Sequence, residues 1–371
     1  MKLQVLIEPQ YRHSFWCEQT LAGIRDEVRR KKYTLLPADT VEADCPEAIF
    51  TVFRRDAPVI VIGSSLTWVP QILAFLAEND VRAIVLCPET AEPSAGQSIV
   101  RIDYSDAIRR LLERLPADGH PRIALFGVHS DSAADAIKER CFCAGQTASG
   151  VSDPQGSVFR NREGLHACSL DFLRRRDDFD AVICANELAA VYLAQQLRRQ
   201  DGDLLSGLQL VCFGRSPLTE LAVPKIMTVS LDHTEIGIQA VRLYAYLEHQ
   251  SQRVSVTVSI QSTLSLGGAV ISPGSAGGAK APAEVAGEGR FYHDAPVQEL
   301  LRLEKLLLGF DALDYDILAG LGSELSIDAI AAACNAGVST VNYHLRNMYH
   351  ALGVRSRQEL CDYLRAMLGI G

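Results

Sequence analysis

Short apolar runs alternate with longer amphipathic stretches over the first 270 residues. The β-branched runs, such as Pro58–Ile62, are typical of buried parallel strands. The longer stretches repeat apolar residues at helical spacing, as Leu21, Ile24 and Val28 do. Regular strand–helix alternation predicts an α/β fold with parallel sheets covered by helices.

The individual elements follow from these runs. About nine strands are too many for one comfortable sheet, so we expect two α/β lobes. The clearest predicted strands are Leu3–Ile7, Pro58–Ile62, Ala83–Leu86, Arg122–Phe126, Ala181–Cys184, Leu208–Phe213 and Val254–Gln261. The clearest predicted helices are Ser14–Lys31, Pro70–Glu78, Ser105–Leu115, Ala133–Arg140, Leu188–Gln200 and Thr234–His249.

The pattern changes after the α/β body, which we place at residues 1–270. Residues 271–295 are rich in Gly, Ala, Ser and Pro without periodicity, which predicts a flexible linker. Residues 296–371 are helical in pattern and contain no strand-like run. The sequence therefore predicts a small all-α domain at the C-terminal end.

Within that domain, residues 325–368 have a helix, a short turn and a second helix. Ser326 is placed to cap the first helix, which runs to Cys334. The second helix is expected at Val338–Leu352, and Gly353 ends it. Ser356 then precedes a final helix at Arg357–Leu368. This is the layout of a helix-turn-helix.

Charge separates the two parts of the chain. The chain has 45 acidic and 36 Lys or Arg residues, a formal charge of −9, which argues against a protein coated in positive charge. Residues 325–371 instead hold four arginines and three carboxylates. A small DNA-binding module on an acidic carrier is therefore compatible with the composition.

The N-terminus indicates a cytoplasmic protein. Its apolar run stops at Ile7 and is followed by Glu8 and Pro9, which is too short for a signal peptide. No uncharged apolar run approaches the ~18–20 residues of a membrane span. The ten cysteines include no C-x-x-C pair, so we expect reduced, buried thiols, with a redox or metal role as the alternative.

Catalytic motifs are missing from the sequence. We find no G-x-S-x-G, P-loop or H-E-x-x-H pattern. We therefore expect no enzyme activity, no cofactor and no metal site.

Residues 1–270 resemble the type I periplasmic-binding-protein fold, in the form used by lactose-repressor-like regulators. Each matching piece is short, but the pieces follow the order of the family. They are Phe15–Ile24, Ser98–Tyr104, Gly119–Leu125, Asp180–Glu187 and Pro224–Val229.

The resemblance implies two lobes joined by three chain crossings, with a small molecule held in the cleft. We place lobe one at about 1–118 and 226–250, and lobe two at about 119–225 and 251–270. Polar residues near the carboxyl ends of the strands become ligand candidates, and the alternative for each is a surface or packing role. They are Tyr11, Ser14, Trp16, Ser64, Ser65, Asp103, Lys138, His166, Asn186 and Arg215.

Two departures from the family affect the expected ligand. Asn186 matches the family motif, and its amide both donates and accepts, which suits a polyhydroxylated ligand. Gly214 and Arg215, however, stand where sugar-sensing relatives have paired aspartates, and Lys138 stands for the usual arginine. An anionic ligand, such as a sugar phosphate or carboxylate, is therefore a hypothesis beside a neutral sugar.

Residues 326–357 resemble the LuxR-type DNA-binding domain of bacterial regulators, most specifically in the Leu-Gly-Val-Arg-Ser-Arg stretch at 352–357. The resemblance places the second helix in the major groove, where Asn and Arg can read base edges. It implies DNA contacts from Ser339, Thr340, Asn342, Tyr343, His344, Arg346, Asn347, Arg355 and Arg357, the histidine and the last two arginines being phosphate contacts or packing residues.

Few basic residues accompany this helix. Asn342 stands where relatives usually have Lys, and Ala351 where a basic residue is common. A monomer should bind DNA weakly, so we expect a homodimer that reads two half-sites. The apolar stripe of Arg357–Leu368 is either its seam or packing within the domain, and Val297–Phe310 has the same ambiguity.

Together these features predict a ligand-responsive transcription regulator with DNA and a small-molecule effector as partners. One alternative is a solute-binding protein of a transport system. The other is a helical protein-interaction module that does not bind DNA.

Overall fold

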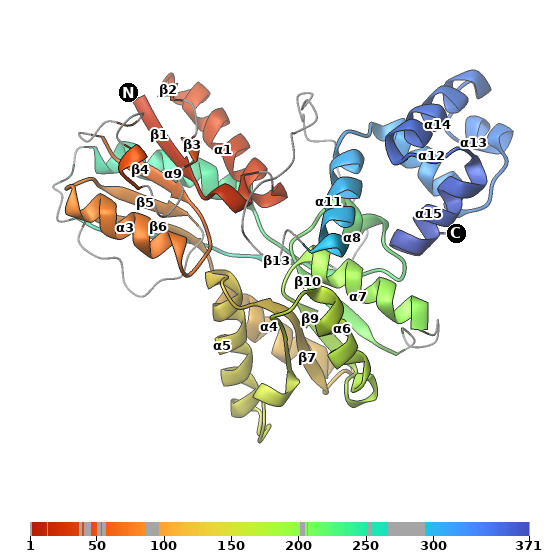
Figure 1. Cartoon of the computed structure of the whole chain (residues 1–371), viewed down its shortest axis with the longest axis horizontal. Coiled ribbons are helices and arrows are strands. Elements are labelled where there is room, and N and C mark those ends of the chain that lie inside the picture. The colour runs from red at the N-terminus through yellow and green to blue at the C-terminus, as the bar shows by residue number, and fades with distance from the viewer. Residues whose placement is uncertain are drawn as a thin grey trace.

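Lobe one is a parallel sheet with helices on both faces (Figure 1). The computed structural model describes residues 2–12, 14–36, 39–40, 46–49, 53, 57–86, 96–200, 205, 207–248, 250, 254–265 and 294–370. The described strands of lobe one are β1 (Lys2–Ile7), β2 (Thr34–Leu35), β3 (Asp39–Thr40), β4 (Val59–Ile62), β5 (Ala83–Leu86), β6 (Gln97–Ile102) and β12 (Thr257–Ile260).

These strands pair in the order β12-β6-β5-β4-β1-β2, with β3 also pairing with β1. Alternate residues of β1 point to opposite faces. Val5 packs in the cluster formed with α1 (Phe15–Lys31) and α9 (His233–Leu247). Leu6 packs in the cluster formed with α3 (Trp68–Glu78). The continuous apolar runs are therefore strands buried on both faces.

Lobe two repeats this arrangement, except that one edge strand of its sheet is antiparallel. Its described strands are β7 (Ile123–His129), β8 (Val158–Asn161), β9 (Ala181–Cys184), β10 (Gln209–Phe213), β11 (Met227–Ser230) and β13 (Thr263–Ser265), in the order β13-β11-β10-β9-β7-β8. Its described helices are α4 (Tyr104–Ala117), α5 (Ala133–Ala148), α6 (Leu165–Leu173), α7 (Glu187–Gln200) and α8 (Pro217–Leu221). The predicted α/β class with two lobes is confirmed.

The lobe boundaries differ from the expected ones. Helix α4 packs against α5, so the first crossing lies near residue 103 and not at 118. Strand β11 pairs with β10 in lobe two, which moves the second crossing from 226 to about residue 231. Strand β12 pairs with β6 in lobe one, which moves the third crossing from 250 to about residue 261. In each case strand pairing or helix packing, which is not local in sequence, decides the boundary.

Two glycines bring α1 and α9 into close contact. A Cβ on Gly23 would lie 2.0 Å from the Thr234 carbonyl oxygen, and one on Gly237 would lie 2.1 Å from the Thr20 oxygen. Only glycine permits this approach of the two backbones. Helix α9, which follows the second crossing, is thereby held against α1 in lobe one.

The C-terminal domain is helical, as expected. Its described helices are α11 (Ala295–Leu308), α12 (Ala312–Gly322), α13 (Ile327–Ala333), α14 (Val338–Leu352) and α15 (Arg357–Leu368). The Ser326 hydroxyl accepts from the Ala329 amide to cap α13, and the Ser356 hydroxyl accepts from the Glu359 amide to cap α15. Gly353 ends α14 with a φ of 70°.

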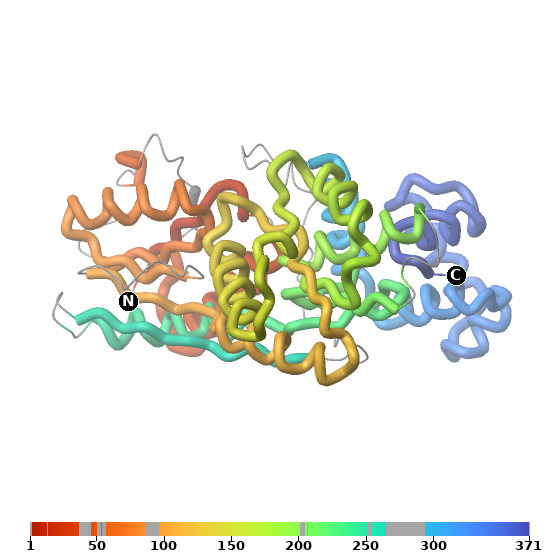
Figure 2. Tube along the Cα trace, turned by 90° about the horizontal axis from the view of Figure 1, so that it is seen from below, coloured from red at the N-terminus to blue at the C-terminus, as the bar shows by residue number. Residues whose placement is uncertain are grey.

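The C-terminal domain is docked on lobe two. Helix α11 packs on α7 and α8, and α15 packs on α7. The Val223 amide donates to the Leu368 oxygen at 2.7 Å, and Gln195 Nε2 donates to the Met367 oxygen at 2.9 Å. Figure 2 shows lobe two between lobe one and the C-terminal domain. The predicted linker, 271–295, lies outside the described residues except for its last two positions.

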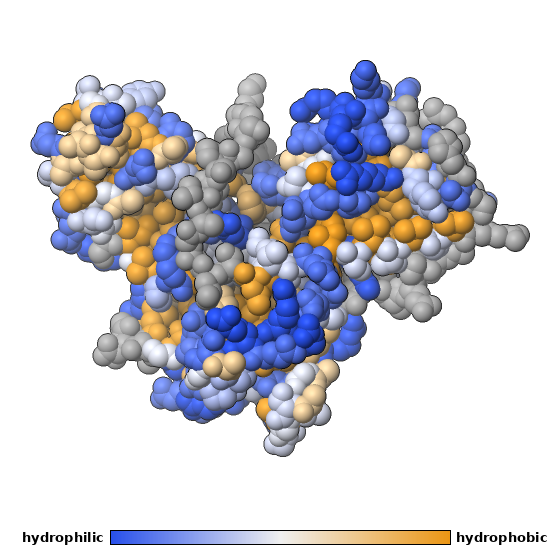
Figure 3. Space-filling view, turned by 180° about the vertical axis from the view of Figure 1, so that it is seen from behind, coloured by the Kyte–Doolittle hydropathy of each residue, from blue (hydrophilic) through white to orange (hydrophobic). Residues whose placement is uncertain are grey.

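Lobe one, lobe two and the C-terminal domain can also be distinguished in the space-filling view from behind (Figure 3). Hydrophobic residues are visible near the junctions between these three parts, and hydrophilic residues dominate the outer surface of lobe two. Of the helices that the structure describes, none is both long and apolar enough to cross a membrane.

Candidate ligand and nucleic-acid sites

A cavity of about 490 Å³ lies between the lobes. Residues from each of the three crossings border it, among them Tyr104, Ser230 and Gln261. Any change in the angle between the lobes must therefore change the shape of this cavity. The volume suits a small-molecule ligand.

Six of the ten ligand candidates line the cavity. Tyr11 and Trp16 come from the turn before α1 and from α1 itself, and Ser64 follows β4. The other three belong to lobe two, where Lys138 lies on α5, Asn186 follows β9 and Arg215 follows β10. The six are Tyr11, Trp16, Ser64, Lys138, Asn186 and Arg215.

The other four candidates are not among the residues that line this cavity. The Ser14 hydroxyl donates to the Tyr11 oxygen, and the Ser65 hydroxyl accepts from the Trp68 amide. Asp103 caps α4 through the Asp106 amide. His166 Nδ1 on α6 lies 3.2 Å from the Tyr192 hydroxyl on α7. Each side chain has a local structural role.

The lobes also touch directly beside the cavity. The Ala133 amide donates to the Ser64 oxygen at 2.7 Å, and the Leu66 amide donates to the Asp131 oxygen at 3.1 Å. Glu8 fixes the lobe-one side of this contact, because its carboxylate accepts from the Ser64 and Ser65 amides. The described structure therefore has its lobes in contact at this point.

Aromatic rings form much of the cavity wall. The Tyr11 and Trp16 ring centres lie 5.3 Å apart, and Trp16 also neighbours His233 at 5.9 Å. In lobe two, the rings of Tyr104 and Phe213 meet edge to face at 5.7 Å. Flat apolar faces of this kind suit the C–H faces of a ring-shaped ligand.

The cavity cations already have carboxylate partners. Lys138 Nζ lies 2.8 Å from Asp135 and donates to the Ala185 oxygen at 2.7 Å. It also lies 4.9 Å from the Tyr104 ring centre. Arg215 is ion-paired with Glu220. These partners neutralise the two cations on which the anionic-ligand hypothesis depended.

Sequence reasoning missed Glu187, His129, Asp232 and His233, which also line the cavity. Burial raises the pKa of Glu187 and lowers the pKa of His129. Burial likewise lowers the pKa of His233 to about 4, so this ring is neutral at pH 7. Their positions at or just after the ends of β9, β7 and β11 were the available signal.

Asn186 uses part of its hydrogen-bonding capacity inside the protein. Its side-chain oxygen accepts from the Ala189 amide at 2.9 Å, at the start of α7. The carboxamide is therefore held in a fixed orientation at the cavity wall.

The helix-turn-helix exposes most of the predicted DNA contacts. Among the nine residues, six are exposed, namely Ser339, Thr340, Tyr343, Arg346, Asn347 and Arg355. Tyr343 is the most open large apolar side chain described, at 63% exposure. This surface of the helix-turn-helix is therefore open to solvent in the described part of the chain.

Asn342, His344 and Arg357 are partly buried. Arg357 donates to the Leu325 oxygen, which ties α15 to the start of α13. His344 Nδ1 lies 2.6 Å from Asp314 Oδ1, which ties α14 to α12. These contacts agree with the packing role that the sequence left open for His344 and Arg357.

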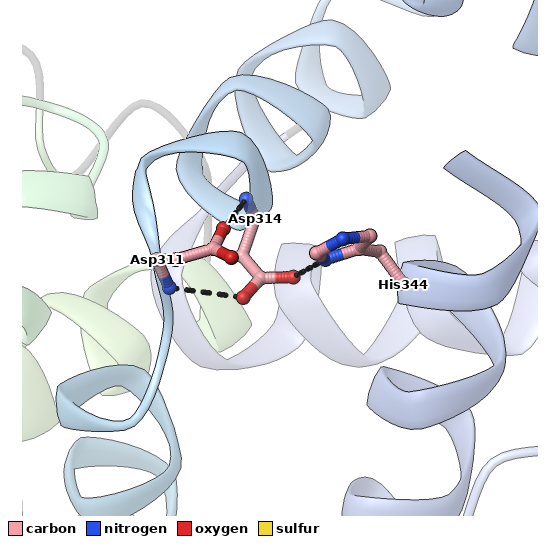
Figure 4. A group of neighbouring side chains, drawn as sticks. All are labelled: Asp311, Asp314 and His344. Atoms are coloured by element: carbon pink, nitrogen blue, oxygen red, sulfur yellow. Dashed lines mark hydrogen bonds and ion pairs between the residues drawn. The ribbon is translucent and has the colours of Figure 1, made fainter. Parts of the chain in front are cut away.

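Asp311, Asp314 and His344 form a compact group at the start of α12 (Figure 4). Their ligand-type atoms lie within 4.8 Å of one another. Asp311 and Asp314 form a reciprocal capping box, and the remaining Asp314 oxygen faces His344. Helix capping and interhelix packing account for the group without a metal ion.

Two family profiles match the chain in the places that the geometry indicates. Residues 112–268 match the family described as "Periplasmic binding protein-like domain". Residues 314–364 match "Bacterial regulatory proteins, luxR family". Residues 112–268 are therefore similar to a periplasmic-binding-protein-like domain and residues 314–364 to a LuxR-type helix-turn-helix, and both resemblances are confirmed.

Curated relatives match only part of the chain. The HTH-type transcriptional regulator TreR of Salmonella typhimurium is 29% identical over 155 residues, which is 40% of this chain and 46% of that protein. TreR of Escherichia coli K12 is 28% identical over 154 residues. The chain thus spans about half the length of the curated relatives it matches.

Solved structures agree on the fold of the two-lobed part of the chain. The transcriptional regulator CelR–cellobiose complex has a TM-score of 0.62 at 18% identity, over 71% of this chain and 83% of that one. A putative ribose operon repressor from Burkholderia thailandensis has a TM-score of 0.59 at 18% identity, over 71% and 98%. These likenesses show the two-lobed fold.

Proposed function

We propose that this protein is a transcription regulator that binds a small molecule between its lobes and DNA through α14. The observation that carries the proposal is the position of the cavity at the three chain crossings, in a chain that also exposes a helix-turn-helix surface. Ligand binding at the crossings favours one lobe arrangement over another. No enzyme activity is part of this proposal, and the relatives are named as regulators.

The cavity favours a neutral polyhydroxylated ligand, such as a saccharide. Ring faces of Trp16 and Tyr104 and the amide of Asn186 offer stacking and hydrogen bonds. Because Lys138 and Arg215 are paired with carboxylates, an anionic group would find no uncompensated cation at either residue. The fold neighbours include a complex with cellobiose, which supports this choice.

DNA binding is proposed to require a homodimer. The helix-turn-helix carries few basic side chains, so one copy neutralises few phosphates. Two copies reading two half-sites add their contacts. Neither rival function requires a homodimer. These rivals are a solute-binding protein of a transport system and a protein-interaction module.

The ligand proposal is tested by thermal shift on the full chain. Cellobiose, sucrose and glucose are compared with glucose 6-phosphate and glucuronate. We expect stabilisation by neutral compounds only, which Trp16→Ala removes and His166→Ala retains, since His166 is not a lining residue. Stabilisation confined to the acidic compounds would favour the anionic hypothesis.

The DNA proposal is tested by fluorescence anisotropy with fragments upstream of the protein's own operon. Arg346→Ala should weaken binding about tenfold, the value of one lost contact. Arg174→Ala, at an exposed arginine on lobe two, is the control. No binding by the full chain, with or without a stabilising saccharide, would favour the protein-interaction module.

A further inference from the structure

Glu304 on α11 is a buried acid at the junction of the C-terminal domain and the sensor. Its side chain is only 3% exposed. Among the buried polar atoms that the structure describes, Glu304 Oε1 is one of those without a hydrogen-bond partner. A buried carboxyl with one oxygen unpaired is costly in a helix that could otherwise dock through Val297, Leu300 and Leu303 alone.

Acids of both lobes influence the charge of Glu304. Glu187 at the start of α7 and Glu18 on α1 act on its charge, and the Ser216 hydroxyl at the start of α8 opposes them. Lys305, the next residue on α11, acts on Glu18. Figure 1 shows α11 on α8, on the side of lobe two that faces α1. Helix α11 therefore carries a buried acid whose pKa depends on acids of both lobes.

Glu187 connects this junction to the cavity. It is a cavity-lining residue, and its Oε2 lies so close to Gly214 that a Cβ there would be 2.3 Å away. Glycine at position 214 thus makes room for the Glu187 carboxyl. Glu187 acts on Glu304 on one side and borders the ligand space on the other.

We propose that α11 couples the interlobe cavity to the helix-turn-helix domain, with Glu304 as the positioning residue that responds to the charge of Glu187. The inference rests on the proposed function, because the coupling has a purpose only in a protein that binds both a ligand and DNA. The experiment that tests the coupling does not depend on that function. Two neighbouring buried acids cannot both ionise without a large penalty. A ligand that hydrogen-bonds to the Glu187 carboxylate stabilises its charge, and Glu304 then keeps its proton while α11 remains docked. An empty cavity leaves the pair in competition and loosens α11.

Burial and the neighbouring acids support this view, because together they raise the pKa of Glu304 to about 8. A docked state with a raised acid pKa is most favoured below the ordinary pKa of 4.5 and loses stability as pH rises toward 8. Undocking of α11 should therefore become easier by about tenfold per pH unit between about 6 and 8.

The test is hydrogen exchange of α11 amides in the full chain between pH 6 and 9, corrected for intrinsic rates, with α3 as an internal reference. Glu304→Gln should remove the pH dependence of α11 and leave α3 unchanged. Glu187→Gln should weaken the pH dependence without removing it, because burial, the largest cause of the raised Glu304 pKa, remains. The double variant should differ from Glu304→Gln by less than twofold. Glu299→Gln, on the same helix but not buried, should behave like the wild type.

The proposal is overturned if wild-type α11 shows no pH dependence, if Glu304→Gln behaves like Glu299→Gln, or if the two buried substitutions act independently. If Glu304→Gln does not fold, Glu187→Gln alone decides, and an unchanged pH dependence of α11 in that variant overturns the proposal. The exchange readout needs no DNA, so a failure to bind DNA in the anisotropy experiment counts only against the proposed function.

Discussion

The role of a charged residue in the cavity depends on its ion-pair and hydrogen-bond partners. From the sequence, Lys138 is a ligand candidate that stands for the usual arginine of the family. The structure places it at the cavity but pairs it with Asp135, three positions earlier on α5. The spacing was visible in the sequence, whereas the burial that makes the pair strong was not.

Lys138→Met should destabilise the protein by about 3–5 kcal/mol, because it leaves the buried Asp135 carboxylate without a counter-charge. Urea unfolding of the full chain measures this. Asp135→Asn combined with Lys138→Met should recover part of the loss, and the exposed Lys225→Met should change little. A single-variant loss below about 1 kcal/mol would contradict the buried pair.

His233 should make stability depend on pH in the acid range. Its pKa is lowered to about 4, against an ordinary value of 6.5, so the unfolded chain takes up a proton that the folded chain refuses. The contribution is fully present above pH 6.5 and is lost as pH falls toward 4. His233→Asn should flatten this part of the stability–pH curve, measured by chemical denaturation, whereas His120→Asn, outside the buried core, should not.

At the scale of elements, local sequence signals were sufficient to predict the limits of a helix wherever capping residues mark its ends. Helix α14 has the predicted limits, Val338–Leu352, and Ser326 and Ser356 cap their helices as expected. Strand β8 was missed because only its first two residues are apolar and because its pairing with β7 defines it. The predicted lobe boundaries were wrong for the same reason, because strands that pair with each other are distant in sequence.

The α1–α9 contact gives a prediction for an element pair. Gly237→Ala places a Cβ 2.1 Å from a backbone oxygen of α1, which no rotamer change can relieve. The helices must move apart, at a cost of about 1–3 kcal/mol. Thermal unfolding measures the loss, and Tyr246→Ala, 51% exposed on the same helix, serves as the control.

At the scale of the whole molecule, the docking of the C-terminal domain on lobe two changes the interpretation of the apolar stripe on α15. Its apolar stripe was open to two interpretations, a dimer seam or packing. Leu360, Leu364 and Met367 are buried within one chain, and the end of the helix contacts lobe two. The structure thus supports packing for these three residues. The sequence offered no local signal for this contact, because α7 and α15 are far apart along the chain.

Arg198→Ala should release the end of α15 from lobe two. Its guanidinium donates to the Val223 oxygen at 2.7 Å and to the Met367 oxygen at 3.3 Å. Losing these charge-assisted bonds should raise hydrogen exchange of the α15 amides about tenfold, equivalent to about 1.4 kcal/mol. Arg199→Ala, its exposed neighbour, is the matched control, and equal effects of the two variants would refute the assignment.

The placement of the crossings also sets an order of assembly during synthesis. Strands β7 to β11 of lobe two lie between residues 123 and 230, so most of that sheet can pair once this segment has left the ribosome. Lobe one, although first in sequence, lacks α9 and its edge strand β12 until residue 260 has been made. The second lobe can therefore pair most of its sheet first, and the nascent first lobe must wait with β6 as an open edge.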